Sequence, residues 1–193
     1  MKKQIWLVFI IALLGATTGC SIKHPVAKDY PQYLAKHGEN GTLPKANLES
    51  IYLIDGKTQT HRYEFRAATV GYAHLWIVEF GKILDATLNA PYVQSSFGKL
   101  EKGGSVTDNA GNVIDFKLTS YEFKHYRAYV SMNIILSNNG KEVLNRTYSS
   151  EGSSKGGRMW GMGPFGMTTS TLDSTRSAID KILIQFINDI PKN

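Results

Sequence analysis

Side chains that could support acid–base or metal chemistry are present in this chain but scattered. The five histidines are His24, His37, His61, His74 and His125. None has a second histidine, a thiolate or a carboxylate at the spacing that metal sites use in sequence. The chain also has neither a P-loop nor a dinucleotide-binding fingerprint. We therefore expect no metal site, no cofactor and no catalytic residue, and we expect that the protein is not an enzyme.

The most unusual chemistry is apolar and lies in the stretch GGRMWGMGPFGM, residues 156–167. Five large side chains alternate there with glycines and a proline, namely Met159, Trp160, Met162, Phe165 and Met167. Methionine adapts its shape to what it contacts, and tryptophan is enriched at interfaces. The composition predicts a loop whose five large residues bind a protein partner. The alternative is that the loop folds back and closes the open end of the core.

The first 20 residues have the layout of a secretory signal. Lys2 and Lys3 precede an apolar run from Ile5 to about Ala16, and small residues lead to Gly19 and Cys20. The apolar run is too short to span a bilayer comfortably. Cys20 is the single cysteine, so the chain can form no internal disulfide although it is predicted to be exported.

A lone cysteine directly after a small-residue cleavage site resembles the acylated cysteine of a bacterial lipoprotein. The resemblance is carried by TTGC, residues 17–20, with Thr17 where the usual motif has Leu. It implies a signal peptide over 1–19 and a lipid anchor, palmitate included, on Cys20. The alternative is an ordinary signal peptide cut near Gly19, which would leave Cys20 as a free thiol. Ser21 follows the cysteine, not the Asp that resembles a retention signal for the inner membrane, so we expect the outer membrane and its periplasmic side.

Removal of the signal leaves 174 residues (193 minus 19), enough for one domain with its own core. The formal charge falls from +6 to +4 with the loss of Lys2 and Lys3. The remaining positive charge is scattered, and no basic stripe with interleaved aromatic residues is visible. Nucleic acid is therefore not an expected partner, whereas the membrane and an envelope protein are.

Hydrophobic periodicity predicts the elements of the domain. Residues 20–48 carry several prolines and glycines without a sustained period, which indicates a lipidated cysteine followed by a flexible tether. The domain then spans 49–193. Its predicted strands are 51–55, 61–69, an irregular one near 97–100, and 112–123, 127–137 and 141–150. Its predicted helices are 72–91 and 170–190.

The last three strands are separated by short turns, and Asn139-Gly140 is a strong hairpin signal because both residue types tolerate positive φ. These patterns predict an α+β fold, in which an antiparallel sheet with a three-strand meander is covered on one face by two amphipathic helices.

The order of strands, helix, meander and terminal helix behind a lipoprotein signal resembles small outer-membrane lipoproteins that are auxiliary components of ABC-type transport systems. NGKEVLNRTYSSEG, residues 139–152, is similar to the last hairpin of that family. Lipoprotein activators of peptidoglycan synthases have a related layout. The resemblance implies a docking or accessory subunit of an envelope transport or assembly complex. The alternative is a carrier that shelters a lipid or another apolar ligand between the helices and the sheet.

Overall fold

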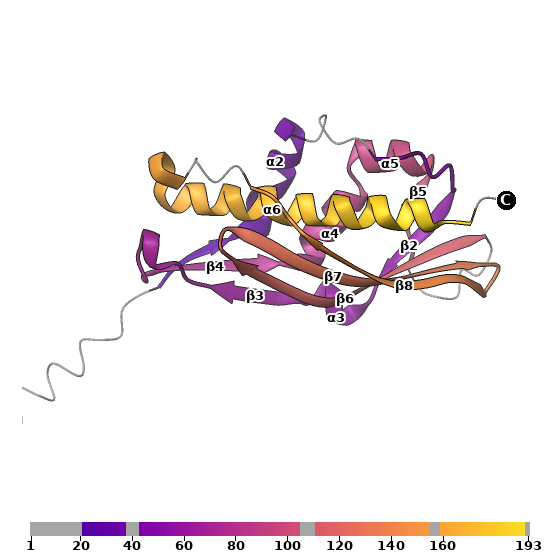
Figure 1. Cartoon of the computed structure of the whole chain (residues 1–193), viewed down its shortest axis with the longest axis horizontal. Coiled ribbons are helices and arrows are strands. Elements are labelled where there is room, and N and C mark those ends of the chain that lie inside the picture. The colour runs from indigo at the N-terminus through magenta and orange to yellow at the C-terminus, as the bar shows by residue number, and fades with distance from the viewer. Residues whose placement is uncertain (1–20, 38–42, 105–110, 155–158, 192–193) are drawn as a thin grey trace, which may run out of the picture.

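The computed structural model describes residues 21–37, 43–104, 111–154 and 159–191. Within them the chain combines helices with two β-sheets, which confirms a mixed α and β fold with an antiparallel-rich sheet (Figure 1). The strands are β1 (Ile22–Pro25), β2 (Ser50–Ile54), β3 (Arg62–Phe65), β4 (His74–Glu79), β5 (Leu100–Lys102), β6 (Asn112–Lys124), β7 (Arg127–Asn138) and β8 (Lys141–Glu151). The helices are α2 (Tyr30–His37), α3 (Gly56–Gln59), α4 (Phe80–Leu88), α5 (Pro91–Phe97) and α6 (Met159–Asp189), with short 3-10 turns η1 (Val26–Asp29) and η3 (Ala68–Val70).

The larger sheet has the strand order β5-β2-β6-β7-β8. Strands β6, β7 and β8 pair antiparallel in sequence order and lie within one residue of the predicted positions. Both of their turns have positive φ at two successive residues, His125-Tyr126 and Asn139-Gly140, as tight hairpins require. β2 joins this sheet in parallel with β5 and β6.

The smaller sheet, in the order β1-β4-β3, was not predicted. The first half of the predicted helix 72–91 is strand β4, and only from Phe80 does the chain become helical. Trp76 and Phe80 have helical spacing, but the run HLWIV between His74 and Val78 is continuously apolar after its first residue, as in a buried strand. The predicted strands 51–55 and 61–69 correspond to β2 and β3, but these lie in different sheets.

Two further expectations are corrected. The segment predicted to be a tether forms β1, η1 and α2 over residues 22–37, and its Val26 and Tyr30 are almost completely buried. The stretch after the predicted helix 72–91 contains helix α5, which has Pro91 in its first turn and ends at Phe97, and the irregular strand predicted near 97–100 is displaced to β5, which begins at Leu100. Proline favours a helix start because its missing N–H has no partner there.

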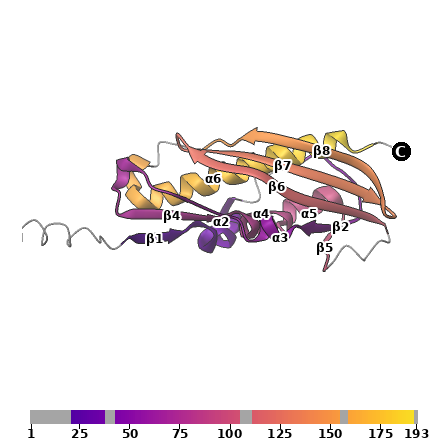
Figure 2. The same cartoon turned by 90° about the horizontal axis from the view of Figure 1, so that it is seen from below.

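Helix α6 runs along much of the length of the molecule and packs on β7 and β8 (Figures 1 and 2). It begins eleven residues before the predicted start at Ser170, so the predicted loop is largely helical. Gly163 has φ 51° and ψ −130° and interrupts the helix, and Pro164 follows it. Glycine adopts this φ without a Cβ clash, and proline can restart the helix. The kink separates residues 159–162 from the main body of α6.

Candidate functional site

A groove of about 430 Å³ lies between α2 and the first turns of α6. Met162 and Phe165 line it from α6, and they are 50% and 73% exposed. Tyr33 and Lys36 line it from α2. The groove therefore offers an apolar surface with a polar and charged rim, which is the usual composition of a protein-binding site.

The five residues predicted to bind a partner do not form one exposed surface in the structure. Met162 and Phe165 are exposed in the groove, whereas Met167 is 1% exposed and belongs to the core. Met167 also lines a separate hollow of about 230 Å³ beside Phe65 and Phe123. The backbone of Met159 and Trp160 is helical, but their side chains lie outside the described part of the structure. Cys20 lies outside the described residues as well.

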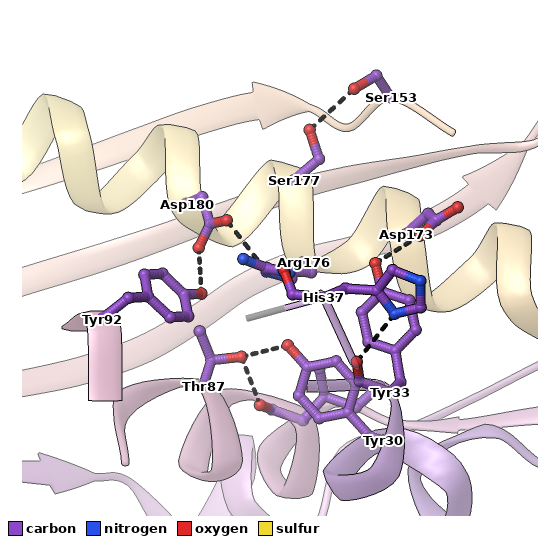
Figure 3. A network of polar contacts seen from close by, with 11 residues as sticks. Tyr30, Tyr33, His37, Thr87, Tyr92, Ser153, Asp173, Arg176, Ser177 and Asp180 are labelled. Carbon is purple, nitrogen blue, oxygen red and sulfur yellow. Dashed lines mark hydrogen bonds and ion pairs between the residues drawn. The ribbon is translucent and has the colours of Figure 1, made fainter. Parts of the chain in front are cut away.

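A buried arginine fixes the α2 wall of the groove. Arg176 of α6 is 7% exposed, and its Nη1 donates to the backbone carbonyl of His37, at the end of α2, over 2.6 Å. The last carbonyls of a helix have no partner inside the helix, so this bond satisfies one of them. Figure 3 shows Arg176 between the side chains of Tyr92 and Tyr33.

The same arginine connects α6 to α5. Its guanidinium lies 4.8 Å from the centre of the Tyr92 ring, and its Nε lies 3.4 Å from Asp180 Oδ2. The hydroxyl of Tyr92 donates to Asp180 Oδ1 over 2.6 Å. A cation over an aromatic ring and beside a carboxylate is stabilised by both. One side chain therefore links three helices that are distant in sequence.

Burial sets the protonation of this network. It raises the pKa of Asp180, although the hydrogen bond from Tyr92 and the charge of Arg176 oppose that rise. Burial and the nearby Asp180 raise the pKa of Tyr92, and burial and the hydrogen bond to Asp173 raise the pKa of Tyr33. Both tyrosines therefore stay neutral near pH 7 and remain hydrogen-bond donors. The network holds helices in place and offers no ionised tyrosine for chemistry.

The helix that carries the groove also approaches the sheet very closely. A Cβ placed on Gly152, just after β8, would lie 1.8 Å from the carbonyl oxygen of Ser174, so only glycine fits there. The Oγ of Ser174 accepts the backbone N–H of Ala128 over 2.8 Å. The hydroxyls of Thr175 and Tyr121 are hydrogen-bonded over 2.8 Å. These contacts fix the depth and rotation of α6, and with them the position of Phe165.

Two arrangements with possible chemistry lie outside the residues that were predicted to be functional. His24 and His74, far apart in sequence, meet across β1 and β4 with 2.8 Å between Nε2 and Nδ1. No group of three or more potential metal ligands occurs among the described residues.

Ser154 lies in the sequence pattern Gly152-x-Ser154-x-Gly156, which is the pattern of a catalytic nucleophile motif. Its Oγ donates a hydrogen bond to the backbone carbonyl of Tyr126 over 2.8 Å. Among the residues that the structure describes, that hydroxyl is bound to the backbone and not to a base.

The contribution of α2 was missed because prolines in residues 21–48 indicated a tether. A signal was nevertheless present. Pro31 lies in the first turn of α2, and Tyr30, Tyr33 and Leu34 have helical spacing.

No described helix is both long and apolar enough to cross a membrane. No protein-family model and no curated protein matches this chain. Among solved structures, protein XCC0632 from Xanthomonas campestris, described as a member of family DUF330, is 11% identical with a TM-score of 0.48, covering 77% of this chain and 86% of that one.

A structure described only as an uncharacterized protein is 14% identical with a TM-score of 0.46, covering 76% of this chain and 95% of that one. The hypothetical protein CT253 from Chlamydia trachomatis is 14% identical with a TM-score of 0.40, over 75% and 98% of the two chains. These similarities are too low to support an argument about function.

Proposed function

We propose that this protein is a non-enzymatic lipoprotein of the outer membrane that faces the periplasm. In this proposal it is a docking or accessory subunit of an envelope transport or assembly complex. The observation that carries the proposal is the groove between α2 and α6, where Phe165 and Met162 are exposed. Large exposed apolar side chains rimmed by polar groups are typical of sites that a partner covers.

The composition of the groove favours a protein partner. Phe165 can fill a complementary pocket and act as an anchor, while Met162 can adapt to the surface around it. Lys36 is exposed on the rim and can orient an acidic group of the partner. Because Arg176 holds α2 in place, the groove is formed before binding, and the partner need not order it.

The packing between helix and sheet favours docking over the alternative of a lipid carrier. Phe186 of α6 is fully buried against Phe116, Phe97 and Tyr148, with ring centroids 6.2 to 6.5 Å away. Filled space at this position leaves no room for an acyl chain.

We also propose that β6–β8 form a three-strand meander that is covered on one face by the amphipathic helices α4 and α6. Their antiparallel pairings and the packing of α6 support this.

The anchor part of the proposal rests on the sequence before Ser21. Metabolic labelling with a radioactive fatty acid tests it. The wild type should incorporate label and fractionate with membranes, and Cys20→Ser should do neither. A wild type without label would contradict the lipoprotein assignment.

The docking part is tested by site-specific photocrosslinking in intact cells. A photoreactive phenylalanine at position 165 should form an adduct of one discrete mass with an envelope protein, identifiable by mass spectrometry. The same residue at Val143, 43% exposed on β8, is the matched control and should form none. Equal adducts at both positions, or none at 165, would contradict a docking role for the groove.

A further inference from the structure

The folded domain begins almost immediately after the predicted acylation site. β1 starts at Ile22, only two residues after Cys20. It pairs in parallel with β4, with Ile22 opposite His74, and the backbone N–H of Ile22 donates to the carbonyl of Ala73 over 2.8 Å. The first described residues are therefore part of a sheet and not of a spacer.

Arg66 reinforces this attachment. Its Nη2 donates to Ser21 Oγ over 2.7 Å, and its Nη1 donates to the backbone carbonyl of Tyr72. Neither acceptor is a carboxylate, so these two bonds do not neutralise the guanidinium charge. Consecutive Cα atoms are about 3.8 Å apart. An acyl group on Cys20 would thus begin within one residue of a side chain that is bonded to the domain.

Exposed apolar residues lie around this point. Ile22 is 51% exposed and Tyr72 is 70% exposed, and the charged residues Lys23 and Arg66 beside them are exposed as well. We call Ile22, Lys23, Arg66 and Tyr72 the anchor-end patch. Figures 1 and 2 place the starts of β1 and β4, and with them this patch, at one end of the molecule and the turn between β7 and β8 at the other.

We infer that the anchor-end patch lies directly on the phospholipid surface, with Ile22 and Tyr72 at head-group depth. Tyrosine is enriched at that depth because its ring is apolar and its hydroxyl is polar, and lysine and arginine are attracted by anionic lipid head groups. The domain would then stand on the membrane by this end, with the β7–β8 turn pointing into the periplasm. The inference rests on the proposed acylation of Cys20.

The test uses the full-length chain, purified as it is processed in the bacterial membrane and reconstituted into vesicles of phosphatidylethanolamine and phosphatidylglycerol. Tyr72→Cys and, as a matched control, Val143→Cys are labelled with a nitroxide. Collision with oxygen, which partitions into lipid, is compared with collision with a water-soluble nickel chelate. The Tyr72 label should be severalfold less accessible to nickel than the Val143 label.

Several outcomes would overturn the inference, and they differ from one another. Equal nickel accessibility of the two labels in membrane-bound protein would show that the domain does not rest on this end, while acylation would stand. Protection of position 72 in native envelope vesicles but not in pure lipid vesicles would assign the patch to a protein partner. Nitroxide uptake by the wild-type chain would reveal a free Cys20 thiol, and the lipoprotein proposal would fail together with the inference.

Discussion

The two halves of helix α6 lie on the same sheet but differ in the polar side chains that they bury. Residues 164–176 bury the apolar Met167 and Leu172 together with a group of hydroxyls and one guanidinium, namely Ser170, Thr171, Ser174, Thr175 and Arg176. Residues 177–189 bury only apolar side chains, namely Ala178, Ile179, Ile182, Leu183, Phe186 and Ile187. The first half buries polar groups that are hydrogen-bonded to the sheet and to neighbouring helices, and it carries the groove, whereas the buried side chains of the second half are all apolar.

The distance between helix and sheet explains the difference. At Gly152 the sheet and the backbone of Ser174 are in contact, so small side chains alone fit between them. Buried hydroxyls there need partners, and Ala128 and Tyr121 supply two of them. Further along, the ring of Phe186 packs against Phe116 of the sheet, with 6.5 Å between the ring centroids. We infer that the second half provides most of the stability, and that the first half fixes the position of the groove.

The largest expected effect comes from a matched pair of phenylalanines in α6. Phe186→Ala should destabilise the fold by about 3–5 kcal/mol, because it removes a fully buried ring and leaves a cavity. Phe165→Ala should change stability by less than about 0.5 kcal/mol, because that ring is 73% exposed. Denaturant-induced unfolding measures both. Equal losses would mean that Phe165 is part of the core, and the groove would lose its status as a binding surface.

A smaller effect is expected where helix and sheet touch. Gly152→Ala should destabilise by about 1–3 kcal/mol, since the new methyl group would collide with the Ser174 carbonyl. Gly56→Ala is the control because no heavy atom lies within 4 Å of the position that its new methyl group would take, and it should be neutral or slightly stabilising. The melting temperatures of the two variants, each compared with that of the wild type, measure the difference in stability. If Gly152→Ala is neutral, the close approach does not constrain α6.

The smallest effect is expected from one hydroxyl in the first half. Tyr121→Phe removes the bond to Thr175 and should cost about 0.5–1.5 kcal/mol. The partly exposed Tyr129 makes no side-chain hydrogen bond within the described residues, so Tyr129→Phe should cost less than about 0.5 kcal/mol. The denaturant concentration at the midpoint of unfolding, measured for each variant, distinguishes the two losses of stability. Indistinguishable midpoints would show that hydroxyl bonding does not secure this half of α6.

The sequence by itself determined the elements whose signals are local. Strands β6, β7 and β8, the Asn139-Gly140 turn and the apolar stripe of α6 were predicted because alternation, turn chemistry and helical spacing lie within a few residues of each other. The exposed character of Phe165 and Met162 was predicted with them, as one of two alternatives.

Only the tertiary structure decided the rest. Residues 74–79 are a strand because β1 and β3 pair with them on both sides, and no local pattern contains those partners. Residues 22–37 are packed because Val26 and Tyr30 are buried in a core that is formed mainly by residues later in the chain. Met167 is buried and Phe165 is exposed although they are two residues apart in sequence, and this difference depends on which side of α6 meets the sheet. Burial and pairing across long sequence distances set all three, and the periodicity of a short window does not identify the distant partners.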